Sequence, residues 1–539
     1  MGGAMDANRK SRKHHWVVAL ALALPLSAWA LWHLPALLGA SSENMEAATG
    51  IVASLAPATP GARTANEVAL IGDGPALGMH LEEADIAAGR IGFDDVLAHG
   101  EQLFTAKFNR FDGQGRPAAT GTGVLRDPEG QPVFLRTSGP DANACSGCHN
   151  DPFIGGAGEV VANVFVLAQA LEPVTESVSP DFSNERNTLG MQGSGAIEML
   201  AREMSGQLHA ARLHALARAQ ATGLPVRTGL LANGISFGAL TARPDGSLDT
   251  SEVAGVDADL VVRPFHQKGA VVSLREFSNN AMNHHHGMQS VERFGTARTG
   301  SDDHDADGIP DELSVGDITA LTLYQAALAT PGQVFPDAFE ARRAVLQGER
   351  SFDAIGCSGC HVPAMTLRSR LFTEPNPFNP PGNLRPEDVD RGHAFDLTRQ
   401  GELPRLEATR GGGAVVRAYT DLKRHDLCDD DIRHYCNERV KQAGIATELF
   451  LTRKLWDVGN SAPYGHRGDL TTLTDAILAH GGEARAVREA YRALPPGQQA
   501  AVVEFLKSLQ MLPPGTRSLV VDSRYRPLNK DALAQALGP

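Results

Sequence analysis

Cys145-Ser-Gly-Cys148-His149 is repeated later in the chain as Cys357-Ser-Gly-Cys360-His361, and this pair of motifs decides the predicted fold. The spacing C-x-x-C-H attaches a c-type haem, because two thiols bond to one porphyrin and the adjacent histidine then lies under the iron. A zinc site would need four ligands in one cluster, whereas these two pairs lie far apart in the sequence. A redox dithiol gives no reason for a histidine at both motifs. The sequence therefore predicts two covalently attached haems c.

The chain also repeats itself around the two motifs. Gly100-Glu-Gln-Leu-Phe104 precedes the first motif and Gly348-Glu-Arg-Ser-Phe352 the second, and both resemble the opening helix of a cytochrome c domain. Apolar residues at helical spacing recur in 317–328 and in 498–509, which predicts a closing helix for each half. We expect a mainly α fold made of two cytochrome c-like domains, with a short tail after them. The domains span residues 91–332 and 333–515, and the tail spans residues 516–539.

Two segments of the first domain depart from the helical pattern. Residues 116–132 have the composition of a loop and hairpin. Residues 226–264 contain short alternating runs and the turn sequence Pro244-Asp-Gly, which predicts a small β insert.

Composition and charge exclude several classes of protein. The 539 residues are 42% hydrophobic and 21% charged, which is an ordinary globular balance and excludes a disordered chain or a multi-span membrane protein. The chain is long enough to bury a core without cross-links. Its net charge of −14, with no basic block beyond the N-terminus, argues against nucleic acid as a partner. An acidic surface better suits a basic protein or a small neutral substrate.

The N-terminus has the pattern of a targeting segment. A basic cluster precedes an apolar run, residues 17–40, and the small residues Ala28 and Ala30 fit a secretory cleavage region. The run is also long enough to remain as one membrane anchor. Both alternatives for residues 1–40 export the rest of the chain, so we expect a periplasmic protein. Residues 41–90 are rich in Ala, Gly and Pro and are interpreted as a linker.

Two further cysteines, Cys428 and Cys436, are not used by the haem motifs. An even pair close in sequence, in an oxidising compartment, predicts a local disulfide. Two free thiols are the alternative.

Residues 450–482 resemble a stretch of the bacterial di-haem cytochrome c peroxidases and MauG-type proteins. The similarity includes Ala462-Pro-Tyr-Gly-His466, the downstream His480, the segment NNAMNHHHGMQSVERFG at 279–295 and DLKRHD at 421–426. Among these proteins the chain most resembles the di-haem oxidoreductase family, whose members are described as peroxidases and sometimes as thiol oxidoreductases. The resemblance covers about residues 95–515.

The resemblance implies a protein ligand on the far face of the second haem, at the position of His480. His361 and His480 would then make that haem six-coordinate. The alternative for His480 is a helix-end histidine that only forms hydrogen bonds. His466 is expected to be structural, near the haem edge.

The first haem is expected to differ. Residues 273–281 align with residues 472–480 as repeat partners, so Ala281 takes the place of the ligand and cannot bind iron. Peroxide cleavage needs an open iron and a group that moves a proton between the oxygens. The resemblance implies Gln and Glu in this region, and the candidate catalytic residues are His284, His285, His286, Gln289 and Glu292. The alternatives are that one of these histidines binds the first haem, or that the segment is a solvated polar loop.

Relatives use a tryptophan between the haems to relay electrons. After the leader the chain has only Trp456, which is therefore the candidate relay, although a single Trp is also typical of a buried core.

A calcium-type loop, DHDADGIPDE, begins at Asp303. Its alternating carboxylates, with Gly308 at the sixth position, predict Asp303, Asp305, Asp307 and Asp311 as ligands of Ca²⁺. The twelfth position is Ser314 and not the glutamate of an EF-hand, so the loop resembles the shorter DxDxDGxxDE loops. A solvated acidic turn is the alternative.

These features predict an exported di-haem oxidoreductase of peroxidase type, with an open catalytic first haem and an electron-transfer second haem. A small electron-donor protein such as a cytochrome c would supply electrons, and hydrogen peroxide or another small oxidant would be the substrate. The alternatives are an electron-transfer cytochrome without catalysis, or a haem oxygenase or partner-protein oxidase that uses the same open haem. A thiol oxidoreductase role is the least supported, because the haems and the predicted disulfide consume all six cysteines.

Overall fold

The computed structural model describes residues 74–114, 142–165 and 183–537, all of which belong to one compact unit. The predicted leader, linker residues 41–73 and the predicted loop and hairpin at 116–132 lie outside the described residues. Within the described ranges, no helix is both long enough and apolar enough to cross a membrane.

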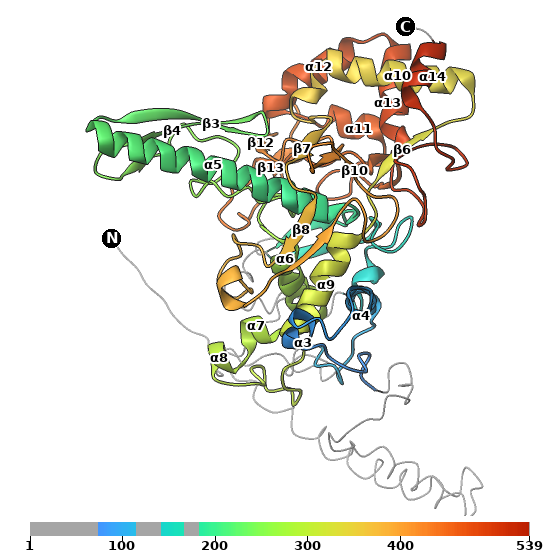
Figure 1. The fold of residues 1–539 in the computed structure, drawn as a ribbon. Coiled ribbons are helices and arrows are strands. Elements are labelled where there is room, and N and C mark those ends of the chain that lie inside the picture. Colours follow the sequence, from blue (N-terminus) through green and yellow to red (C-terminus); the bar gives the residue numbers. More distant parts are fainter. Residues whose placement is uncertain (1–73, 115–141, 166–182, 538–539) are drawn as a thin grey trace, which may run out of the picture. The chain divides into compact units, whose positions relative to one another are not determined.

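The helices form two groups along the chain (Figure 1). The group before residue 330 comprises α3 (Glu83–Ala87), α4 (Phe93–Thr105), α5 (Ser194–Thr222), α6 (Leu274–Ala281), α7 (Val291–Phe294), α8 (Thr296–Thr299) and α9 (Val315–Ala327). The later group comprises α10 (Phe339–Ala354), α11 (Leu473–Leu478), α12 (Arg485–Ala493), α13 (Pro496–Ser508) and α14 (Lys530–Leu537).

The strands are short and form small separate sheets. They are β1 (Val161–Phe165), β2 (Ser183–Asn187), β3 (Val226–Ala232), β4 (Ile235–Ala242), β5 (Leu248–Asp249), β6 (Gly332–Phe335), β7 (Met365–Leu367), β8 (Leu371–Glu374), β9 (His393–Asp396), β10 (Glu407–Ala408), β11 (Ala414–Val416), β12 (Arg424–Asp426), β13 (Leu449–Leu451), β14 (Leu509–Gln510) and β15 (Val520–Asp522). The sheet orders are β1-β2, β3-β4-β5, β10-β11-β7, β8-β9, β12-β13 and β14-β6-β15.

The same helix crossing occurs in both halves of the chain. Helix α4 packs against α9, and α10 packs against α13. At each crossing a glycine lets the backbones meet: a Cβ at Gly100 would lie 2.2 Å from the carbonyl oxygen of Ala320, and one at Gly348 would lie 1.9 Å from that of Ala501. These two glycines are therefore required by the close approach of the helices.

The predicted mainly α fold class is wrong. The chain is 36% helical and 15% strand, a mixed composition with several small sheets. The physical reason lies in residues 365–451, where most strands have only two to four residues. Strands of that length carry too few residues to show alternation, so they are not visible as a sequence pattern.

The predicted β insert is confirmed. Strands β3, β4 and β5 form an antiparallel sheet within residues 226–264, and the chain turns between β4 and β5 at Gly246, whose φ is +86°. This sheet packs on the long helix α5, which the sequence analysis did not identify (Figure 1). Helix α5 ends at Gly223, a left-handed glycine cap.

The two halves share one hydrophobic core. Its buried residues run from Leu77, before α3, to Trp456, and they include Leu367 and Phe372 from the small sheets of the second half. Residues 520–522, from the predicted tail, add strand β15 to β6 in parallel. The helices near the second motif pack in a separate cluster, which contains Phe352 of α10, Leu473 of α11 and Phe505 of α13.

Candidate functional site

Each cysteine motif lies on the wall of a cavity. The first cavity has a volume of about 400 Å³ and is lined by Cys145, Cys148 and His149. The second has a volume of about 250 Å³ and is lined by Cys357, Cys360 and His361. In both motifs a short 3₁₀ turn starts at the first cysteine, which brings both thiols and the histidine to the same cavity.

The motif histidines are oriented in the same way in both cavities. Nδ1 of His149 donates to the carbonyl of Leu189 at 2.9 Å, and Nδ1 of His361 donates to that of Tyr419 at 3.1 Å. Burial lowers the pKa of each to about 4, so both imidazoles are neutral at physiological pH. A neutral imidazole whose Nδ1 donates has its lone pair on Nε2, which is the form that binds a metal.

His480 faces His361 across the second cavity. The two ring centroids are 6.4 Å apart, and Nδ1 of His480 donates to the carbonyl of Ala476 at 2.7 Å. Burial lowers the pKa of His480 as well. A metal about 2 Å from one nitrogen of each ring fits between rings at this separation. The donor set of this cavity therefore suits a haem iron with two axial histidines.

A disulfide-closed loop holds His480 in position. Cys428 and Cys436 form a disulfide, and the ring of Tyr435 packs against His480 with centroids 6.2 Å apart. Within this loop, Asp429 accepts hydrogen bonds from the backbone N–H of Gly482 at 3.1 Å and from Arg485 at 3.0 Å. Arg488 in turn donates to the carbonyl of His480 at 3.0 Å. The backbone around His480 is thus held by hydrogen bonds at His480 and at Gly482.

His425 also lines the second cavity. It lies within the segment DLKRHD, but the sequence alone predicts no role for it. Its ring bonds Asp421 at 2.9 Å and Glu483 at 2.8 Å. Burial opposes its charge, but these carboxylates and Cys360 raise its pKa to about 11. His425 is therefore an imidazolium beside the second motif.

The first cavity has no imidazole at the position equivalent to His480. Helix α6 is capped by Ser273 and helix α11 by Thr472, each through a hydrogen bond from the third residue of its helix, so the two helices are aligned as the repeat predicts. Ala281 ends α6 and lines the first cavity together with Leu274 and Phe277. An alanine methyl group cannot bind iron, so Ala281 itself offers no ligand to this cavity.

The predicted catalytic residues separate into two sets. His285 and His286 line the first cavity, in the π-turn Met282–His286 that follows α6. His286 bonds the carbonyl of Ala142 at 2.7 Å and lies 3.3 Å from Sγ of Cys145. Among the described residues that form this wall, His284, Gln289 and Glu292 do not appear.

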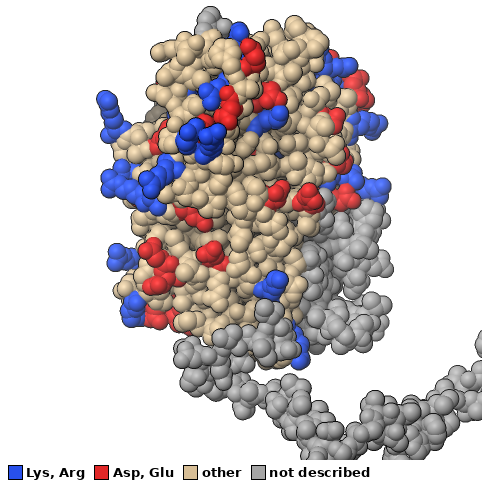
Figure 2. Space-filling view, turned by 90° about the vertical axis from the view of Figure 1, so that its right-hand side faces the viewer, with Lys and Arg blue, Asp and Glu red and all other residues tan. Residues whose placement is uncertain are grey.

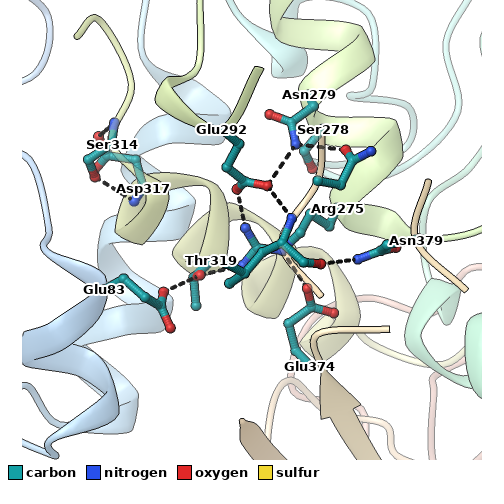
Figure 3. A network of polar contacts seen from close by, with 12 residues as sticks. Glu83, Arg275, Ser278, Asn279, Glu292, Ser314, Asp317, Thr319, Glu374 and Asn379 are labelled. Carbon is teal, nitrogen blue, oxygen red and sulfur yellow. Dashed lines mark hydrogen bonds and ion pairs between the residues drawn. The ribbon is translucent and has the colours of Figure 1, made fainter. Parts of the chain in front are cut away.

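Glu292 belongs instead to a buried polar network around Arg275 (Figure 3). Arg275 forms ion pairs with Glu292 and Glu374 and donates to Thr319, which donates to Glu83 at 2.5 Å. Glu292 also accepts from the backbone N–H of Leu384 at 2.7 Å. This network fixes α6 against α9 and strand β8, so Glu292 supports the helix that carries Ala281.

Two polar side chains that the sequence analysis missed line the first cavity. Gln325 on α9 donates from Nε2 to the hydroxyl oxygen of Ser278 on α6 at 2.7 Å. Helix 315–327 also contains Asp317, Thr319 and Thr322, so no sequence signal singles out Gln325. His266, which has a φ of +64°, is a third polar residue of this wall.

Trp456, the candidate electron relay, lines neither cavity as far as the structure describes their walls. Its side chain is buried in the shared core against Gly193. Its indole nitrogen has no hydrogen-bond partner among the described residues.

The acidic loop brings three of its four predicted calcium ligands together. Carboxylate oxygens of Asp303, Asp305 and Asp307 lie within 4.8 Å of one another. Asp311 is not part of this group, and its backbone N–H closes the loop on the carbonyl of Asp302 at 2.8 Å. The loop joins α8 to α9.

One family model matches part of the chain. Residues 403–509 match the family model described as "Di-haem oxidoreductase, putative peroxidase". This part of the chain is therefore similar to the di-haem oxidoreductases. The matched segment contains the disulfide loop and His480, so the predicted resemblance to di-haem oxidoreductases is confirmed.

Two solved structures are similar to this chain at low scores. One is a hydrazine synthase of Kuenenia stuttgartiensis pressurized with 20 bar xenon, with 14% identity, a TM-score of 0.31 and coverage of 84% of this chain and 100% of that one. The other is a MauG-like protein associated with microbial copper homeostasis, with 13% identity, a TM-score of 0.22 and coverage of 58% and 88%. Neither similarity is high enough to carry an argument. None of the curated proteins matches the chain.

Proposed function

We propose that the chain is an exported di-haem c oxidoreductase of peroxidase type. His149 and its two cysteines would hold one haem in the first cavity, and His361 and its two cysteines would hold the other in the second. Bound there, each haem supplies an iron that exchanges electrons and that, where one face is open, binds a small oxidant.

One observation carries the proposal, the difference between the two cavities at the position of His480. In the second cavity His480 stands opposite His361, whereas in the first cavity Ala281 takes that place. Two axial histidines favour electron transfer, and an empty face favours binding of a substrate. The first cavity is therefore the proposed catalytic site.

His285 is the proposed acid–base group of the first cavity. It lines the cavity four residues after Ala281. An imidazole can take a proton from one oxygen of a bound peroxide and return it to the other. Ser278 and Gln325 add hydrogen-bonding groups to the same cavity, and Phe277 and Leu274 add apolar surface.

The proposed partners are hydrogen peroxide or another small oxidant and a small electron-donor protein. Figure 2 shows a face on which basic and acidic side chains are intermingled, so on this face neither sign of charge alone would steer a donor. We propose a periplasmic location because covalent haem attachment and the Cys428–Cys436 disulfide both suit an exported protein. We also propose that Asp303, Asp305 and Asp307 bind Ca²⁺.

Electron paramagnetic resonance of the purified protein with its haems attached tests the function. We expect a high-spin and a low-spin ferric signal, with the high-spin signal consumed by hydrogen peroxide in the resting or the half-reduced protein. Two low-spin signals that do not respond to peroxide in either state would overturn the enzyme and leave an electron carrier.

A further inference from the structure

The two cavities share one wall. The segments 187–190 and 451–454, together with Gln267, line both of them. We call this set of residues the partition. The carbonyl of Leu189, which orients His149 of the first cavity, belongs to it.

The partition carries more positive charge than its protein neighbours balance. Arg453 and Lys454 stand beside one carboxylate, Asp457, which pairs with Lys454. On one flank, Arg186 and Lys268 share Glu438, at 2.5 and 3.4 Å. The four cations Arg186, Lys268, Arg453 and Lys454 thus have two carboxylates, Glu438 and Asp457, in or near contact. This leaves an excess of two positive charges.

Arg453 is the cation for which the described residues offer no direct partner. Its guanidinium makes no hydrogen bond or ion pair with them, although it lines both cavities. Burial lowers its pKa, and Asp457 only partly opposes this. A partly buried guanidinium without a contacting anion is unfavourable, so a ligand that brings an anion to this wall would be stabilised there.

Other features of the partition point to the same kind of ligand. Gln267 is 5% exposed, and its Nε2, which can only donate, has no hydrogen-bond partner among the described residues. The amide donor of Gln267 and the guanidinium of Arg453 would together favour a ligand with a negatively charged hydrogen-bond acceptor. Burial, together with Arg186, His285 and Arg453, lowers the pKa of the neighbouring His266 to about 3.

We propose that the partition is a carboxylate-binding site, in which Arg453 and Gln267 hold propionate groups of the haems in both cavities. This inference rests on the proposed function, because each haem c brings two carboxylates that must be neutralised where they are buried. The two excess positive charges match one carboxylate from each cavity. Arg453 is thus a shared counterion and not a residue of one site only.

Redox titration of the full-length protein with both haems attached tests this. Removing a cation beside a haem disfavours the added electron, so Arg453→Gln is expected to lower both reduction potentials. Arg453→Lys, which keeps the charge, is expected to leave both potentials close to wild type. Arg417→Gln is the matched control, because Arg417 is an exposed arginine paired with Glu407 and its loss is expected to move neither potential.

A potential shift in one haem only, or in neither, would overturn the proposal. If Arg453→Gln does not fold, Gln267→Leu gives the same test without a change of charge, with smaller shifts expected in both haems. The proposed function fails separately: a wild-type chain that does not stain for two covalent haems would contradict it, whereas two haems with unmoved potentials would contradict only this inference.

Discussion

At the scale of single residues, the proposed function rests on one difference, Ala281 in the first cavity and His480 in the second. We expect His480→Gly to convert the second haem from low spin to high spin, because the cavity keeps His361 but loses its second imidazole. Added imidazole is expected to restore the low-spin signal in the electron paramagnetic resonance spectrum. Unchanged low-spin character in His480→Gly would show that another side chain is the ligand.

The reciprocal substitution, Ala281→His, is the matched control. It places an imidazole at the equivalent end of α6, which is aligned with α11 by the same serine or threonine cap. We expect a second low-spin haem and a loss of peroxide binding. A variant that keeps full peroxidase activity would contradict the alignment of the two cavities.

Gly348 is a second residue with a measurable consequence. Gly348→Ala would place a methyl group 1.9 Å from the carbonyl oxygen of Ala501, so α10 and α13 must separate. We expect a loss of about 1–3 kcal/mol of unfolding free energy, measured by thermal or denaturant unfolding. Gly206→Ala is the control: it lies exposed in α5 with no atom within 4 Å, and we expect a gain of about 0.5–1 kcal/mol. Equal effects would contradict the role of the crossing.

At the scale of elements, helices with caps and apolar periodicity could be predicted, and short strands could not. The closing helix α9 begins at the capping box of Ser314 and Asp317, a signal within one turn of chain. Strand β10 has two residues and pairs with β11 through only two positions. Such strands depend on tertiary contacts, because no local pattern can specify them.

The candidate site shows the same limit. A fixed spacing predicts the motif cysteines, His149 and His361 as candidate haem-binding residues. The family resemblance and the repeat predict His480. The position of Glu292 in the sequence predicts a catalytic residue, but its side chain forms an ion pair with Arg275 on α6 and belongs to the buried network. The sequence does not predict that Arg453 and Gln325 line a cavity, because this depends on where the folded backbone places them.

The contact between the N-terminal segment and α9 predicts a pH dependence. Asp317 accepts hydrogen bonds from His80 at 2.6 Å and from the backbone N–H of Leu81 at 3.0 Å. Burial opposes the charge of Asp317, but His80 and His99 hold its pKa below the usual 3.8, so its stabilisation is present above that pH and is lost as the pH falls. The hydrogen bond to Asp317 raises the pKa of His80 above 6.5, so its contribution is full below 6.5 and is lost at higher pH.

The two effects overlap between about pH 4 and 6.5. We therefore expect the difference in unfolding free energy between wild type and Asp317→Asn to be largest in this window, as measured by urea unfolding at several pH values. A difference that is constant from pH 3 to 9 would show that Asp317 acts only as a neutral cap.

At the scale of the whole molecule, stability depends on how the parts of the shared core are joined. Helix α9 is the central connection, because it contacts α3, α4, α5, α6 and β8. The acidic loop lies directly before α9, and its three converging carboxylates repel one another unless a cation neutralises them. A cation in this loop would therefore stabilise the start of α9 and every element packed on it.

Removal of calcium provides the test of this connection. A ligand that binds only the folded chain at 100 times its Kd adds about 2.7 kcal/mol to the unfolding free energy. We expect a calcium chelator to lower the Tm of the wild-type protein, and added Ca²⁺ to restore it. Asp305→Asn, at a buried position of the loop, is expected to have the lower Tm already and to ignore the chelator. Asp245→Asn, in an exposed turn, is the control and should respond to the chelator like wild type. A wild-type Tm that the chelator leaves unchanged would show that the carboxylates hold the loop through hydrogen bonds alone.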